Sequence, residues 1–349
     1  MPSHHPIYLD HAATTPLLPQ ALAAMQEGWH VWANPSSPHA PGRAARSALE
    51  TARARIKAVL GWQGEVIFTS GASEALALAI GRAKVAQVLA SAVEHDAALR
   101  VAGDVPRLQV GEGGLVDAEE LACRLRDGGP ALVVVQQVNS ETGVVQDVPA
   151  IAAMVRAAGG LLLCDAAQGA GKLGLPDADM VVLAAHKFGG PVGVGALLVR
   201  DYAMLAPGGG QERGYRGGTE ALPLVLGMVA ALEAGNAWME RAAHLREGLT
   251  QALEDRGAEL VAAASPRSPT IAAYRMPGRS SAAQLIRFDG AGIAVSAGSA
   301  CSSGSLKASH VLMAMGYPHP GEVIRVSIGR ETTEAEIARF VEVWKEIRG

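Results

Sequence analysis

Two charged side chains, each at the end of an apolar run, could together bind an aldehyde cofactor. Lys187 follows the apolar residues 180–185, and Asp165 ends another apolar run twenty-two positions earlier. An amine can form a Schiff base with an aldehyde, and a carboxylate can keep a pyridinium nitrogen protonated. The pair therefore predicts pyridoxal 5'-phosphate as the cofactor. The alternative interpretation is a surface lysine that follows a core strand, which is the commoner situation for a lysine taken alone.

Two further polar residues fit the same cofactor. Gln168 follows Asp165 by three positions and could hydrogen-bond the phenolic oxygen of the ring. His95 could stack on the ring and move protons, because imidazole titrates near neutral pH. Structural interpretations stay open beside these roles, since Asp165 could cap the next helix and a lone histidine usually serves packing.

A strand, a glycine turn and a helix start follow one another in residues 66–74, and this junction could bind a phosphate. The first turn of a helix presents N–H groups without helical partners and the positive end of the helix dipole. Such junctions are also common in α/β proteins that bind no anion. A second stretch of small residues, 208–219, could donate further N–H groups or could be a plain loop.

Cys301 and Arg325 also stand in surroundings that point to chemistry. Cys301 lies among glycine, alanine and serine in residues 296–305, rather than among the large apolar residues of a core. That context favours a nucleophilic thiol on a loop with few anchors. The three cysteines lie far apart, so neither a disulfide framework nor zinc-ligand spacing is expected. Arg325 interrupts an apolar strand pattern and needs a carboxylate partner, either a structural Asp or Glu or an amino-acid substrate.

The pattern of apolar runs predicts an α/β fold with a mostly parallel sheet covered by helices, followed by a smaller α+β lobe. A domain boundary is expected near residues 245–265. Strands are expected at residues 66–69, 132–138, 161–164, 180–184, 194–199, 270–276, 293–296 and 323–328. Helices are expected at residues 43–60, 151–158, 219–246 and 332–347, the last with a cap at residues 332–334.

Composition excludes several classes of function. The 349 residues are 49% apolar and only 4% aromatic, which indicates a large aliphatic core. A net charge of −4, with no long run of like charges, argues against a nucleic-acid partner. The chain has no signal-like N-terminus and no apolar stretch long enough to span a membrane, so we expect a cytoplasmic protein without a membrane partner.

Taken together, these residues resemble the cysteine desulfurases, in the class V aminotransferase branch of the fold-type I pyridoxal-phosphate enzymes. The resemblance implies a seven-stranded type of sheet with helices on both faces. It also implies a large cofactor-binding domain at residues 15–250 and a small domain, formed by residues 1–14 and 251–349, that carries the cysteine loop. The segments that carry the resemblance are residues 8–16, 34–39, 69–74, 138–143, 165–168, 186–187, 208–219 and 299–303.

The resemblance assigns a role to each matching position. Lys187 is the Schiff-base lysine, Asp165 pairs with the pyridine nitrogen, Gln168 binds the phenolic oxygen and His95 stacks on the ring. Ala184 stands where the family usually has a serine, which removes one hydroxyl donor to the phosphate. The other expected roles are phosphate binding by Ala72, Ser73 and His186, donation of Thr219 across a homodimer interface, cofactor and substrate-carboxylate binding by Asn139, and substrate-carboxylate binding by Arg325 and Asn34.

The implied reaction removes sulfur from L-cysteine, giving L-alanine and a persulfide on Cys301, with Lys187 and His95 as the other catalytic residues. The sulfur would pass to an acceptor protein for iron–sulfur cluster or other thio-cofactor assembly. No resident metal is expected, and the one metal role considered is that of Cys301 as an iron–sulfur ligand during transfer. The alternatives are another pyridoxal-phosphate lyase or aminotransferase, such as a selenocysteine lyase, and a non-catalytic scaffold for sulfur delivery.

Overall fold

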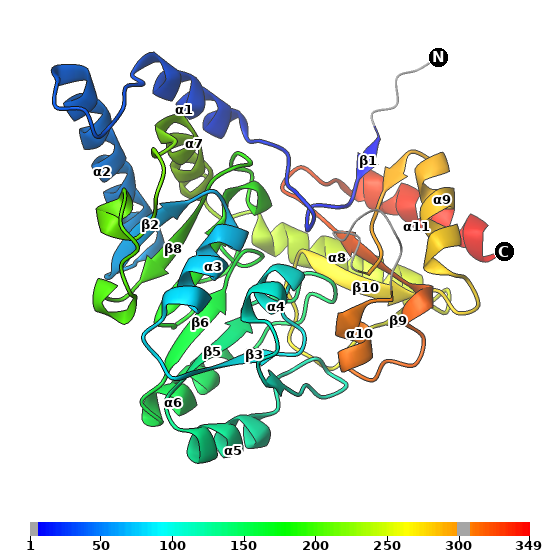
Figure 1. Cartoon of the computed structure of the whole chain (residues 1–349). Helices are drawn as coiled ribbons and strands as arrows, with labels where there is room; N and C mark the ends of the chain where they lie inside the picture. The colour runs from blue at the N-terminus through cyan, green and yellow to red at the C-terminus, as the bar shows by residue number, and fades with distance from the viewer. Residues whose placement is uncertain (1–5, 299–307) are drawn as a thin grey trace.

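The computed structural model describes residues 6–298 and 308–349. Figure 1 shows two lobes, with helix α8 (Met239–Glu254) running from the larger lobe along the smaller one. Cys301 lies outside the described residues, so its predicted place near the cofactor stays a prediction.

The larger lobe contains a seven-stranded sheet that confirms the predicted α/β class. Neighbouring strands are parallel from β7 to β4, whereas β8 is antiparallel to both β7 and β2. The strand order across the sheet is β2 (Glu65–Thr69), β8 (Gly195–Val199), β7 (Met180–Ala184), β6 (Leu161–Asp165), β5 (Ala131–Gln136), β3 (Gln87–Ser91) and β4 (Arg107–Leu108).

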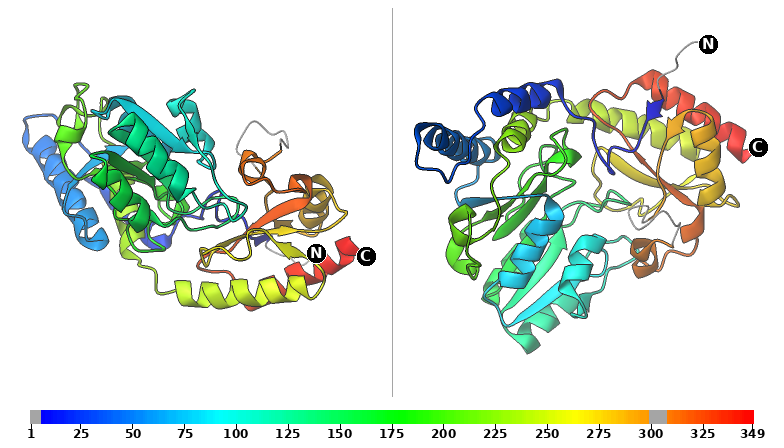
Figure 2. Two further views of the ribbon diagram at one scale, coloured as in Figure 1. Left: turned by 90° about the horizontal axis from the view of Figure 1, so that it is seen from below. Right: turned by 45° about the horizontal axis from the view of Figure 1, so that its top comes forward.

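Helices cover both faces of this sheet, as expected (Figure 2). Alternate side chains of a strand point to opposite faces, and along β5 Val133 packs into one core cluster while Val134 packs into the other. Among the described residues, no helix is long and apolar enough to cross a membrane. The first face carries α1 (Pro19–His30), α2 (Ala40–Leu60), α5 (Ala118–Gly128), α6 (Val148–Ala157) and α7 (Leu222–Glu233), and the second carries α3 (Ala72–Arg82) and α4 (Asp96–Ala102).

The smaller lobe has its own core, which contains Phe288, Phe340 and Trp344. The rings of Phe288 and Phe340 stack with centroids 4.6 Å apart. Its elements are an antiparallel sheet of β12 (Val323–Ser327), β10 (Ile271–Arg275) and β9 (Glu259–Leu260), a parallel pair of β1 (Ile7–Tyr8) and β11 (Ile293–Ala294), and the helices α8, α9 (Ser281–Gly290), α10 (His310–Ala314) and α11 (Glu334–Arg348). Short 3-10 turns lie at Ala185–Lys187, Tyr202–Met204, Glu212–Gly214 and Pro320–Glu322.

The long helix predicted over residues 219–246 is two helices, α7 and α8. Gly235, which follows the C-cap residue Ala234 of α7, adopts φ +70°. This left-handed conformation ends a helix, and glycine adopts it without a steric penalty. The buried side chains of α8, such as Leu249, belong to the core of the smaller lobe. The domain boundary near residue 250 stays a prediction, although this packing favours a boundary between α7 and α8.

The start of α11 agrees with the predicted cap. The Thr333 hydroxyl accepts the Glu336 N–H at 3.3 Å, and the Glu336 carboxylate accepts the Thr333 N–H at 2.8 Å. This reciprocal arrangement is a capping box, which satisfies two N–H groups at the start of the helix.

Candidate active site

A cavity of about 350 Å³ lies at the carboxyl ends of β2, β6 and β7, where ligands bind in open α/β sheets. Asp165 is the last residue of β6, and Lys187 lies in the turn that follows β7. Residues predicted to bind the cofactor line this cavity from four segments of the chain. They are Ala72, Ser73, His95, Asp165, Gln168, His186 and Lys187.

The Lys187 amine is positioned by the N-terminal segment of the chain. Its Nζ donates to the backbone oxygens of Ala12 and Ala13, both at 2.8 Å. The Thr15 N–H in turn donates to the His186 oxygen at 2.8 Å, which ties the two segments together. Two backbone acceptors therefore hold the amine in place at the wall of the cavity.

The Asp165 carboxylate is buried, with 6% of the residue exposed, and it accepts the Ala167 N–H at 2.9 Å. Burial raises the pKa of Asp165, against the lowering effects of the Ala167 N–H, His95 and Lys187. A protonated ring nitrogen beside this carboxylate would stabilise its charged form. The donor set thus fits the predicted pairing with a pyridine nitrogen.

Gln168 and His95 lie on opposite sides of Asp165 in sequence and line the same cavity. The Gln168 amide donates one N–H to the Ala12 oxygen at 2.8 Å, and an amide carries a second N–H that an oxygen ligand could accept. The His95 Nδ1 accepts the Ala97 N–H at 3.1 Å, so the proton of the neutral imidazole is on Nε2. His95 can therefore donate a proton only through Nε2 unless the ring reorients.

The start of α3 has the backbone geometry expected of an anion cradle. Gly71, the N-cap, adopts φ +150°, and a Cβ built on it meets no atom within 4 Å. Gly71 lines the cavity together with Ala72 and Ser73, and its lack of a side chain keeps the backbone there open to a ligand. This geometry fits a phosphate, whose oxygens require such a close approach to backbone.

His186 lines the same cavity and would be a neutral donor to a phosphate there. Its Nδ1 lies 3.2 Å from the Thr14 hydroxyl. Burial and then the charges of Lys187 and Lys172 lower the pKa of His186 to about 4. At neutral pH His186 would therefore offer a phosphate a hydrogen bond but no positive charge. Ala184, which also lines the cavity, adds no polar group.

Four predicted site residues do not line this cavity. Asn139 is buried nearby, and its Oδ1 accepts the N–H groups of Glu141 and Thr142 at 2.9 and 2.8 Å. Arg325 lines an adjoining cavity of about 30 Å³, whose wall also includes His95. Asn34 and Thr219 are exposed elsewhere on the larger lobe. The roles assigned to these four residues, like those of the residues in the cavity, stay predictions.

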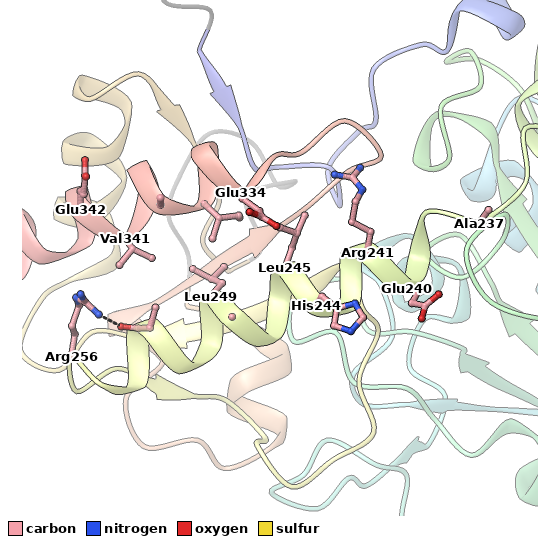
Figure 3. Close-up of a pocket in the computed structure, with 14 residues that line it drawn as sticks. Ala237, Glu240, Arg241, His244, Leu245, Leu249, Arg256, Glu334, Val341 and Glu342 are labelled. Carbon is pink, nitrogen blue, oxygen red and sulfur yellow. Dashed lines mark hydrogen bonds between the residues drawn. The ribbon is translucent and has the colours of Figure 1, made fainter.

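A larger cavity, about 930 Å³, is a groove between α8 and α11 on the smaller lobe (Figure 3). Leu245 and Leu249 form part of its apolar floor. Its two arginines are bonded to backbone oxygens, Arg241 to Thr332 at 2.7 Å and Arg256 to Ala252 at 2.6 Å. None of the predicted site residues that the structure describes lines it, so this groove is not the candidate active site.

Lys172 is a titratable residue near the site that the sequence did not single out. It follows Gln168 by four positions, and only 5% of its surface is exposed. Burial, together with the charge of Lys187, lowers the pKa of Lys172 to about 7. Its position in a segment of small residues, Gly169 to Gly171, gave no sign that the side chain would be buried.

Replacing Lys172 with methionine is expected to remove a pH dependence of stability. Between about pH 7 and 10.5 the unfolded chain holds the Lys172 proton while the folded chain has released it, so folding stability rises with pH. Lys172→Met should be more stable than the parent at the acidic end of this window, by about 2–4 kcal/mol. Denaturant unfolding of both proteins across the window measures this, and parallel pH profiles would contradict it.

Comparison with known proteins agrees with this geometry. A family model described as aminotransferase class-V matches residues 7–340. A cysteine desulfurase of Cereibacter sphaeroides is 37% identical to the chain, and the match covers 97% of this chain and 94% of the relative. A cysteine desulfurase of Trichormus azollae is also 37% identical, and the match covers 98% of this chain and 92% of the relative.

Solved structures are similar to the chain as well. A NifS-like protein from Rickettsia africae ESF-5 superposes with a TM-score of 0.90 at 29% identity, covering 98% of this chain and 99% of that one. SspA in complex with cysteine superposes with a TM-score of 0.80 at 29% identity, covering 94% and 100% of the two chains. The chain therefore belongs to the class-V aminotransferase family, whose members depend on pyridoxal 5'-phosphate.

Proposed function

We propose that this protein is a cysteine desulfurase, which takes the sulfur of L-cysteine and releases L-alanine. The observation that carries the proposal is that Lys187 and Asp165 line one cavity with the anion cradle of α3. The cysteine desulfurases that share 37% of its residues over nearly the whole chain support this function, and SspA was solved with cysteine bound.

When bound, pyridoxal 5'-phosphate supplies an electron sink that makes the α-proton of an amino acid removable. Asp165 would keep a proton on the ring nitrogen, and the N–H groups of Ala72 and Ser73 would hold the phosphate. Lys187 would be the amine that binds the cofactor and then moves protons, and the Ala12 and Ala13 oxygens hold this amine in place. His95 is the second proton carrier, acting through Nε2.

Cys301 is the proposed nucleophile. Its thiolate attacks the sulfur of L-cysteine, so an S–S bond forms and the substrate's C–S bond breaks. The electron pair of the broken C–S bond stays on the β-carbon, which takes up the proton that the Cys301 thiol released. Alanine then leaves, and Cys301 carries a persulfide. Cys164 is fully buried in β6 and does not line the cavity, and burial raises the pKa of its thiol, so it is not the nucleophile. Cys123 is exposed on α5, outside the cavity.

The persulfide sulfur would pass to an acceptor protein for iron–sulfur cluster or other thio-cofactor assembly. This transfer would take place in the cytoplasm. Thr219 supports a homodimer, because it is exposed and does not line the cavity of its own chain, as a residue donated to a partner subunit would be. A homodimer is also supported by the exposed Trp29 and Trp32, a T-shaped pair near the end of α1 with 59% and 40% of their surfaces in solvent.

Replacing Cys301 with serine tests the proposed nucleophile. Serine keeps the size of the side chain but is a far weaker nucleophile toward sulfur, so alanine formation from L-cysteine should fall by at least about 100-fold. Cofactor absorbance should not change. Cys123→Ser is the matched control and should react at the parent rate. Equal alanine formation by Cys301→Ser and the parent would contradict the assignment.

A further inference from the structure

The buried guanidinium of Arg325 already holds a carboxylate of this chain. Its Nη2 donates to the Asp10 Oδ1 at 2.6 Å, and its Nη1 donates to the Ser140 oxygen at 3.0 Å. An isolated parallel bridge between Asp10 and Ser327 places the turn after β1 beside β12, the strand that carries Arg325. The sequence left open which carboxylate pairs with Arg325, and the structure shows that it is the structural residue Asp10.

One donor of Arg325 is unused within the described part of the chain. Its Nε is buried and has no hydrogen-bond partner there. A buried N–H without a partner costs free energy, and an anion at this position would satisfy it. The side of the guanidinium that Nε and Nη2 form together therefore suits an incoming carboxylate.

Any two-point carboxylate contact with Arg325 involves the nitrogen that now binds Asp10. A guanidinium offers a carboxylate two paired edges, Nε with Nη2 and Nη1 with Nη2, and both contain Nη2. Nη2 carries two N–H groups, so Asp10 and a substrate carboxylate could share it only with their negative charges side by side. Repulsion between these charges makes Asp10 a competitor of the substrate carboxylate.

Exposure decides which partner of the ion pair can be exchanged. The Asp10 side chain is 20% exposed, whereas that of Arg325 is 6% exposed. A displaced Asp10 can reach water, while Arg325 keeps a carboxylate throughout, so no buried charge is left unpaired during the exchange.

We propose that the Asp10 carboxylate takes the place of the substrate carboxylate in the free enzyme. It binds Arg325 there, and competition between the two carboxylates sets the affinity for the amino acid. This inference rests on the proposed function and on the expected role of Arg325 in binding the carboxylate of L-cysteine. Asp10 tunes the affinity for the substrate and is not a catalytic residue. A thiol that lacks a carboxylate leaves the Asp10 ion pair in place, so only ligands with a carboxylate compete with Asp10.

The test is the binding of L-alanine and of cysteamine to the cofactor-loaded protein, followed by cofactor absorbance. Cysteamine has the amine and the thiol of the substrate but no carboxylate. Asp10→Asn keeps an oxygen for Nη2 but removes the competing charge, so the Kd for L-alanine should fall about tenfold. The Kd for cysteamine should change less than about twofold. Asp96→Asn is the matched control, because Asp96 also borders the small cavity but pairs with Arg100 at 3.0 Å, and it should leave the L-alanine Kd near the parent value.

A second variant covers the case in which Asp10→Asn does not fold well. Asp10→Ala leaves Arg325 without its carboxylate, so added acetate should raise the melting temperature of this variant in a saturable way and leave that of the parent unchanged. An unchanged or higher L-alanine Kd in Asp10→Asn, or no acetate effect in Asp10→Ala, would overturn the proposal. Turnover of L-cysteine by the parent protein is measured beside these titrations, and its absence would refute the proposed function whatever the variants at Asp10 do.

Discussion

Lys187→Ala is expected to lower alanine formation from L-cysteine by roughly 10⁴-fold, the scale seen when a central catalytic group is removed. The variant lacks the amine that binds the aldehyde carbon and moves the substrate proton. Its N-terminal segment also loses the two hydrogen bonds that the Ala12 and Ala13 oxygens accept from Nζ. Alanine quantification and the absorbance of the bound cofactor after dialysis measure both consequences.

Lys84→Ala is a suitable control for this variant, because Lys84 is exposed and does not line the cavity. It should retain the parent activity and colour. A yellow, dialysis-resistant cofactor in Lys187→Ala would show that another amine holds the aldehyde. In that case Lys172, buried beside Lys187, would be the first residue to examine.

Asp165→Asn should have the second largest effect, a loss of about 10²–10³-fold in alanine formation with the cofactor still bound through Lys187. An amide cannot stabilise a positive charge on the ring nitrogen as a carboxylate does, so the electron sink is weakened. Cofactor absorbance measures cofactor binding, and steady-state rates measure alanine formation. Parent-like turnover in Asp165→Asn would contradict the pairing of Asp165 with the ring.

The stability of the cofactor-free protein offers an independent check on Asp165. Because burial raises its pKa, its contribution to stability is greatest at low pH and is lost as the pH rises through the folded-state pKa. Asp165→Asn should lack this loss and should be at least as stable as the parent at neutral pH. A strongly destabilised variant would point to a structural role instead.

The sequence predicted those parts of the fold in which apolar residues are continuous. The runs that became β5, β6, β7 and β8 are almost entirely buried, and buried parallel strands contain few polar interruptions. β3 was missed because its residues, Gln87–Ser91, lie in an alanine-containing stretch that also suits a helix. The break between α7 and α8 depends on the backbone of Gly235, which helical periodicity does not reveal.

The candidate site could be predicted where a residue follows a strand, as Asp165 and Lys187 do. The contacts of the N-terminal turn could not be predicted in this way. Ala12 and Lys187 are 175 positions apart, and Asp10 and Arg325 are 315 apart, so their pairing is set by the packing of the two lobes. A sequence shows that Arg325 needs an anion but not which carboxylate supplies it.

The most direct test of the central claim is to locate sulfur on the protein after reaction with L-cysteine. The cofactor-loaded protein is mixed with L-cysteine, its thiols are alkylated, and its peptides are analysed by mass spectrometry while free alanine is quantified. We expect alanine and one added sulfur atom on the peptide that contains Cys301, with none on those of Cys123 and Cys164. Alanine formed without added sulfur on Cys301, or sulfur found on Cys123 instead, would contradict the proposed transfer.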